Sequence, residues 1–322
     1  TFQKGQSAST GFHPSSKMNQ EGQHTVMNRK HRVFSAMRVW AIARNTFTQL
    51  VRMKVFYFML IFSALIIGAN LLFLSFTFEQ ELKILKDVSF GAMSLFASIF
   101  AIVGTALLIP KDIEDRTLYT ILTKPVPRIE YLLGKLLGIL LLIAASILLM
   151  SLLFFTVLYI RQHGILAERI ASFPRQVSEA QIATFREDIF SRGLQPELLL
   201  GVLAVFLKAA VAASVALFVS TFASSTLFTI IVSLVVYFIG HAQSLALDYY
   251  FSGGEIRSAA QRFFAGLIAV IFPNFQLFNV TDGLTAGEVV STSLMARLVG
   301  LTAFYLTIYS LVSWLVFAKK EL

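Results

Sequence analysis

The feature that most constrains this chain is a set of six long apolar segments, at approximately 55–77, 90–110, 131–160, 198–220, 226–247 and 296–318. Each is near or above the ~20 residues that a helix needs to cross a hydrocarbon core. A helix satisfies its own backbone hydrogen bonds where no water can reach them. We therefore expect an all-α polytopic membrane protein with six transmembrane helices, in a single transmembrane domain that fills residues 55–322.

The composition agrees with a membrane protein and excludes several kinds of site. Hydrophobic residues make up 56% of the 322 and charged residues 14%, whereas a soluble domain carries about 25% charged residues. A chain so poor in charge could not cover its surface with polar groups in water. The sequence contains no cysteine, so disulfides, thiolate metal sites and cysteine nucleophiles are excluded.

Two segments precede the first apolar one. Residues 1–32 are polar and have no apolar period, which predicts a disordered tail. Residues 33–54 are basic and apolar at helical spacing, which favours an amphipathic helix at the lipid headgroups over a simple basic flank. The residues of this predicted interfacial helix that would meet the membrane surface are Arg38, Trp40, Arg44 and Arg52.

The distribution of charge predicts the orientation of the chain. With both termini inside, 16 of the 27 Lys and Arg residues lie on the inner side, and 6 of the 18 Asp and Glu residues accompany them. This agrees with the positive-inside rule and with an even number of spans. The net charge of +9 is thus an asymmetry across the membrane and needs no nucleic-acid partner.

Two further segments are expected outside the bundle or within its outer half. Residues 161–197 form the longest outer loop, in which Ser178 and Gln181 have capping-box spacing and predict a short amphipathic helix. Residues 263–280 are too short and too interrupted, by Pro273 and Asn274, for a span. We interpret them as a re-entrant element before the last span.

Catalytic motifs are missing from the sequence. Gly134–Lys135 lacks the upstream glycine and the following hydroxyl of a phosphate-binding loop, and neither HExxH nor GxSxG occurs. We expect no catalytic residue, metal site or cofactor on this chain. Gly134 and Gly138 form a GxxxG pair at a helix entry, which predicts close local packing rather than a dimer seam.

Lys208 is an ionisable residue near the middle of the fourth apolar segment. A charge at that depth is costly and marks a functional candidate. Two interpretations stay open, a lysine that pairs within the bundle and one that contacts a substrate or a lipid headgroup.

The inner loop at 111–130 is the most informative stretch. It begins with charges, becomes amphipathic through Leu118 and Leu122, and is interrupted at Pro125 and Pro127 before the third apolar segment. This pattern predicts a short, charged helix on the cytoplasmic surface. Such a helix suits docking to a soluble partner.

The pattern Glu114-x-Arg116-Thr117-Leu118, with Leu122, Pro125, Arg128 and then Gly134-Lys135, resembles the type-2 ABC (ATP-binding cassette) exporter permease family. The similarity extends over about 33–322 and is greatest to single-cassette bacterial permeases, including the branch that acts in nitrous-oxide-reductase maturation. Such a permease does not hydrolyse ATP itself. ATP and Mg²⁺ would bind to a separate partner subunit.

The resemblance implies a multi-pass protein of the bacterial inner membrane. Two permease copies, most simply a homodimer, would dock on two cytoplasmic ATP-binding cassette subunits. The resemblance also implies contact with membrane lipids and allows a periplasmic accessory protein as a further partner. Segment 111–130 would be the coupling helix, and the helix at 33–54 would lie beside it. The implied coupling residues are Glu114, Asp115, Arg116, Thr117, Leu118, Leu122, Pro125 and Arg128.

Two other functions compete with this interpretation. An ion-driven secondary transporter would need internal repeats and acidic residues at mid-membrane, and the sequence has neither. A membrane-embedded lipid-modifying enzyme would need carboxylates or histidines near an interface. The residues available for that role are thinly spread: Glu79, Glu81, His241 and Asp248.

Overall fold

The computed structural model describes residues 34–73, 78–114, 127–172, 178–223, 225–252, 266, 272–285, 287 and 290–319. Ser35–Leu322 form one compact unit. The predicted disordered tail, 1–32, lies outside the described residues. Within the described ranges the secondary structure is helical and includes no strand.

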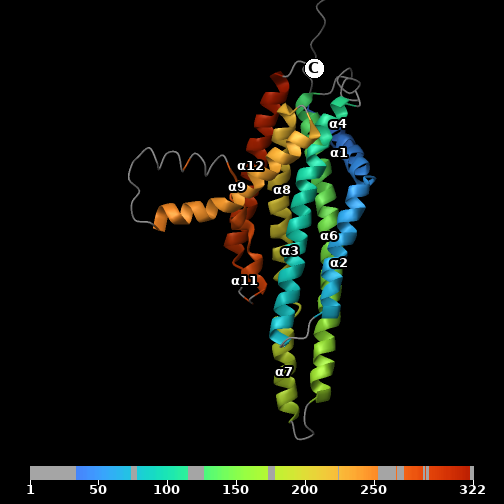
Figure 1. Ribbon diagram of the computed structural model, residues 1–322, viewed down its shortest axis with the longest axis vertical. Helices are drawn as coiled ribbons and strands as arrows, with labels where there is room; N and C mark the ends of the chain where they lie inside the picture. The colour runs from blue at the N-terminus through green and yellow to red at the C-terminus, as the bar shows by residue number, and fades with distance from the viewer. Residues whose placement is uncertain are drawn as a thin grey trace, which may run out of the picture. The chain divides into compact units, whose positions relative to one another are not determined.

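The helices are drawn in Figure 1. In chain order they are α1 (Ala36–Val51), α2 (Lys54–Phe73), α3 (Phe78–Ala106), α4 (Leu108–Glu114), α6 (Arg128–Ser172), α7 (Glu179–Arg192), α8 (Leu198–Phe222), α9 (Thr226–Ser252), the 3-10 helix η1 (Phe275–Phe278), α11 (Thr281–Thr285) and α12 (Thr292–Lys319).

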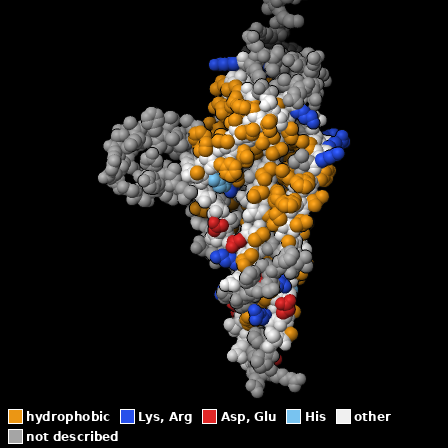
Figure 2. All heavy atoms as spheres, viewed as in Figure 1, with side chains coloured by type: hydrophobic (Ala, Val, Ile, Leu, Met, Phe, Trp, Pro, Cys, Tyr) orange, Lys and Arg blue, Asp and Glu red, His pale blue; other side chains and the backbone are white. Residues whose placement is uncertain are grey.

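Five helical stretches of the described chain are long and apolar enough to cross a membrane: Gln80–Asp112, Arg128–Ser172, Leu198–Phe222, Thr226–Ser244 and Thr292–Lys319. The number rises to six if α1 and α2, which are bent by 66°, count as one broken span. The predicted all-α membrane fold is confirmed with five to six candidate spans. Figure 2 shows hydrophobic side chains gathered over the upper part of this face, with acidic side chains below them.

Helix α8 is the centre of the bundle because its small side chains allow neighbours to approach closely. Its middle carries the run Ala209-Ala-Val-Ala-Ala-Ser-Val-Ala216, which is buried throughout. Small residues are what helix interfaces in membranes favour. Accordingly α3 and α12 pack extensively on α8, and α6 and α9 also contact it.

Helix α6 is much longer than a membrane span. Its 45 residues reach about 67 Å at 1.5 Å per residue, so the helix continues well beyond the apolar segment at 131–160. Arg161 on this extension pairs with Glu81 of α3 at 3.0 Å. The helix expected in 161–197 is α7, where the Ser178 N–H donates to the Gln181 side-chain oxygen at 3.2 Å.

The stretch expected to be re-entrant, 263–280, is described at residue 266 and from 272 onward. There the Asn274 side chain accepts a hydrogen bond from the Gln276 N–H and caps η1. The centroid of the Phe275 ring lies 4.8 Å from that of the Tyr237 ring and 5.5 Å from that of the His241 ring. These contacts hold η1 against α9. The re-entrant course of this stretch stays a prediction.

Candidate functional site

The predicted coupling segment is described at its two edges. Asp115, Arg116, Thr117, Leu118, Leu122 and Pro125 lie outside the described residues, and Glu114 is described as the last backbone position of α4. Arg128 is the first residue of α6. The structure therefore describes how the two ends of the segment are anchored.

A buried polar cluster joins these two ends. The Tyr131 hydroxyl donates to Asp112 Oδ2 at 2.6 Å, and Lys135 Nζ lies 2.7 Å from the same oxygen. All three residues are buried. Because Asp112 is on α4 and the other two are one turn apart on α6, the cluster holds the segment's entry and exit together. The sequence alone did not predict that Asp112 and Lys135 form this buried contact.

The start of α6 also binds α1. Glu130 is fully buried and accepts hydrogen bonds from Arg38 Nε at 2.6 Å, from Arg38 Nη2 at 2.8 Å and from the Ser35 N–H at 2.9 Å. Three donors on one carboxylate favour its charged form. Of the predicted interfacial residues, Arg38 makes this contact, while Trp40, Arg44 and Arg52 are exposed.

Two glycines of α6 allow α1 to lie close to it. A Cβ atom on Gly134 would be 2.6 Å from the Ile42 Cβ. One on Gly138 would be 2.6 Å from the Thr46 Cβ and 2.8 Å from the Ala43 carbonyl oxygen. Non-bonded carbon atoms prefer 3.5–4.0 Å, so neither position has room for a side chain. The predicted close local packing of this GxxxG pair is confirmed, with α1 as the partner.

Arg128 anchors the end of α12 to the same place. Its Nη1 donates to the carbonyl oxygens of Phe317 and Ala318, both at 2.8 Å, and its guanidinium lies 5.8 Å from the centre of the Phe317 ring. Tyr131 stacks on Phe317 with ring centres 5.9 Å apart. A cation at a helix C-terminus satisfies carbonyls that have no partner within the helix. Four helices, α1, α4, α6 and α12, thus meet at the edges of segment 111–130.

Lys208 borders a cavity of about 500 Å³ between α3, α8, α9 and the residues around α11. The residue is 8% exposed, and its Nζ donates to the Ser94 hydroxyl at 3.2 Å. No described carboxylate lies within 4 Å of this ammonium. The structure therefore provides no ion pair for the charge among the described residues.

The rest of this Lys208 cavity is amphipathic. Tyr237 donates to the Ser98 hydroxyl at 2.9 Å, and His241 Nδ1 lies 3.0 Å from the Tyr237 carbonyl oxygen. Apolar side chains complete its walls: Phe90, Leu95, Ile99, Ile102, Leu234 and Phe238. Asp87 and Asp282, both exposed, lie on its border. Sequence reasoning found Lys208 from its apolar setting and missed the polar side chains that α3 and α9 bring to it.

The described residues offer little to the enzyme alternative. No group of three or more His, Asp or Glu that could hold a metal occurs among them. Glu81, one of the few carboxylates available to an enzyme, is buried and paired with Arg161.

A comparison with curated proteins finds no match for the chain. A family model described as ABC-2 family transporter protein matches residues 15–247. The match takes in α1, the edges of segment 111–130 and Lys208. It covers well over half of the sequence, and the chain therefore belongs to the ABC-2 transporter family, as a permease component of an ABC transporter.

Proposed function

We propose that this chain is the export permease of an ABC transporter in a bacterial inner membrane, coupled to ATP hydrolysis on a separate cytoplasmic subunit. Two permease copies would form the membrane unit, each docked on one ATP-binding cassette that holds ATP and Mg²⁺. Closure of the cassettes would shift the permease between inward- and outward-facing states, as a partner's ligand shifts any two-state equilibrium. An accessory protein on the periplasmic side belongs to the same proposal.

The observation that carries this proposal is the meeting of four helices at the edges of segment 111–130. Asp112, Glu130 and Arg128 bind α4, α1 and α12 to the first two turns of α6. Movement of the segment would therefore move these helices together, because charge-assisted hydrogen bonds connect them. That is the arrangement a coupling helix needs, because it must move whole spans and not bend locally.

Charge reversal in the segment tests the coupling role. Glu114→Arg or Arg116→Glu is expected to abolish binding of the ATP-hydrolysing subunit or its stimulated ATP hydrolysis, because a docking helix depends on charge complementarity. Membrane insertion should be normal. Co-purification and ATP hydrolysis of the assembled complex measure the effect.

The matched control is Arg186→Glu, since Arg186 is exposed on α7 and belongs to neither edge of the segment. It should bind and stimulate the ATP-hydrolysing subunit as the wild type does. Normal binding and stimulation by the Glu114 and Arg116 variants would show that the coupling assignment is wrong.

We further propose that Lys208 contacts the substrate or a lipid headgroup. Lys208→Met is expected to lower ATP hydrolysis by the complex in proteoliposomes by about tenfold, a usual size for coupling between sites. Thermal stability should be unchanged or higher, because the variant removes a buried charge that no described carboxylate pairs.

Ser214→Ala is the control for this variant. Ser214 is buried on α8, like Lys208, and its hydroxyl bonds to the Val211 carbonyl of its own helix at 2.7 Å. Unchanged hydrolysis with reduced stability in Lys208→Met would instead make Lys208 a structural residue.

A further inference from the structure

A second polar cavity, of about 520 Å³, lies where the start of α3 meets the end of α7 and the end of α11. It is distinct from the Lys208 cavity and carries three cations. We call it the outer cation cavity. Its main lining residues are Gln80, Lys83, Lys86, Arg192, Gln195 and Thr285. Helices remote in sequence thus place three positive side chains around one hollow.

Two cations of the outer cation cavity, Lys83 and Lys86, form no salt bridge among the described residues. No described carboxylate lines the cavity. Lys86 is only 2% exposed. The third cation, Arg192, pairs through its Nε with Asp188 one turn earlier on α7, at 2.9 Å. An anion would complete this cavity, because a buried cation needs a counter-charge.

The depth of Lys86 matches that of lipid phosphates. The apolar segment of α3 begins near residue 90, and Lys86 and Lys83 precede it by four and seven residues. At 1.5 Å per residue they lie about 6 and 10 Å beyond it along the helix. The headgroup layer occupies roughly the first 5–8 Å outside the hydrocarbon core, so Lys86 lies within this layer and Lys83 just beyond it.

An apolar hollow adjoins the charged one. Gln195 lines both the outer cation cavity and a neighbouring apolar cavity of about 560 Å³. The walls of this apolar cavity include Leu152, Phe155, Tyr159, Leu194 and Leu199. An anionic group beside an apolar chain is the chemistry of a phospholipid. A soluble phosphate compound would leave the apolar hollow unused.

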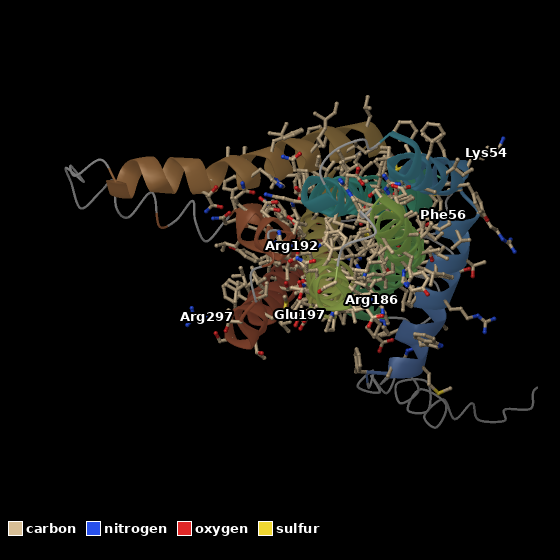
Figure 3. The ribbon with its side chains drawn as sticks, turned by 90° about the horizontal axis from the view of Figure 1, so that it is seen from below. Lys54, Phe56, Arg186, Arg192, Glu197 and Arg297 are labelled. Carbon is tan, nitrogen blue, oxygen red and sulfur yellow. The ribbon has the colours of Figure 1, made fainter. Side chains whose placement is uncertain are left out.

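We propose that the outer cation cavity binds the phosphate-bearing headgroup of an anionic membrane phospholipid, with an acyl chain in the adjoining apolar hollow. Lys83, Lys86 and Arg192 are the phosphate ligands. This lipid site goes beyond the proposed export function and does not depend on it. In Figure 3 Arg192 lies toward the middle of the bundle, whereas Arg297 points away at its edge.

The test uses the purified full chain in neutral detergent, without an ATP-hydrolysing subunit, so that its failure leaves the export proposal untouched. Thermal unfolding is followed while dioctanoyl phosphatidylglycerol, dioctanoylglycerol or inorganic phosphate is titrated. Only the phospholipid should raise the unfolding temperature, because a ligand that binds the folded state stabilises it. Lys83→Gln and Lys86→Gln should each raise the half-saturating concentration about tenfold, the loss expected for one charge-assisted bond.

Arg297→Gln is the matched control, since Arg297 is exposed at the start of α12 and does not line the cavity. It should leave the half-saturating concentration unchanged. Lys83 is itself exposed, so its variant remains informative even if Lys86→Gln does not fold.

Three results would overturn the proposal. Equal protection by inorganic phosphate would exclude a lipid ligand, and equal protection by dioctanoylglycerol would exclude phosphate recognition. An Arg297→Gln effect as large as that of Lys83→Gln would show general charge attraction instead of a site.

Discussion

Replacement of Asp112 by alanine is expected to lower the free energy of unfolding by about 3–5 kcal/mol, the usual cost of leaving one member of a buried ion pair without its partner. Lys135, 2.7 Å from Asp112, is buried and would lose its carboxylate. The Tyr131 hydroxyl would lose its acceptor at the same time. Equilibrium unfolding of the purified permease in mixed detergent micelles measures the change.

A double variant separates the ion pair from the packing around it. Asp112→Ala combined with Lys135→Met removes both charges, so the folded state no longer contains a buried ammonium without a partner. Most of the lost stability should return, as apolar replacements of buried ion pairs are often neutral. A single Asp112→Ala variant within about 0.5 kcal/mol of the wild type would show that water reaches the cluster; such a small change is typical of surface sites.

The apolar segments predicted the spans well because the thickness of the hydrocarbon core sets their length. The segment at 198–220 corresponds closely to α8, Leu198–Phe222, and that at 296–318 to α12, Thr292–Lys319. Apolarity could not predict how far a helix continues into water. Helix α6 extends to Ser172, beyond the apolar stretch, and is tied to α3 there through the Arg161–Glu81 ion pair.

Parts of the candidate site were predictable where the residue type and its immediate sequence context were sufficient. A lysine within an apolar segment was sufficient to find Lys208, and the spacing of Gly134 and Gly138 was sufficient to expect close packing. The partners of these residues lie on other helices. Ser94, for example, is 114 positions from Lys208, and no periodicity relates the two. The coupling role of segment 111–130 stays a prediction from family resemblance.

The second large effect is expected at Gly138, where leucine should displace α1 from α6. The atoms that the new side chain would meet are the Cβ of Thr46 and the carbonyl oxygen of Ala43, at 2.6 and 2.8 Å. Neither can move without its helix, so rotamer changes cannot relieve the clash. Overpacking of this kind typically costs 1–3 kcal/mol, and moving α1 outward is the simplest relief. We expect coupled ATP hydrolysis to fall with it, because α1 meets the edge of segment 111–130 through Arg38 and Glu130.

The displacement of α1 can be measured directly because the chain has no cysteine to remove. Nitroxide labels on cysteines introduced at Arg44 of α1 and Leu148 of α6, both exposed, should report a longer distance in Gly138→Leu. Gly164→Leu is the control, since Gly164 is on the same helix and a Cβ there would meet nothing within 4 Å. If Gly138→Leu kept the wild-type distance and wild-type hydrolysis, close approach of α1 to α6 would not be needed for coupling. A longer distance with normal hydrolysis would show that the close packing of α1 on α6 is not needed for coupling. Helix α1 would then have an anchoring role only.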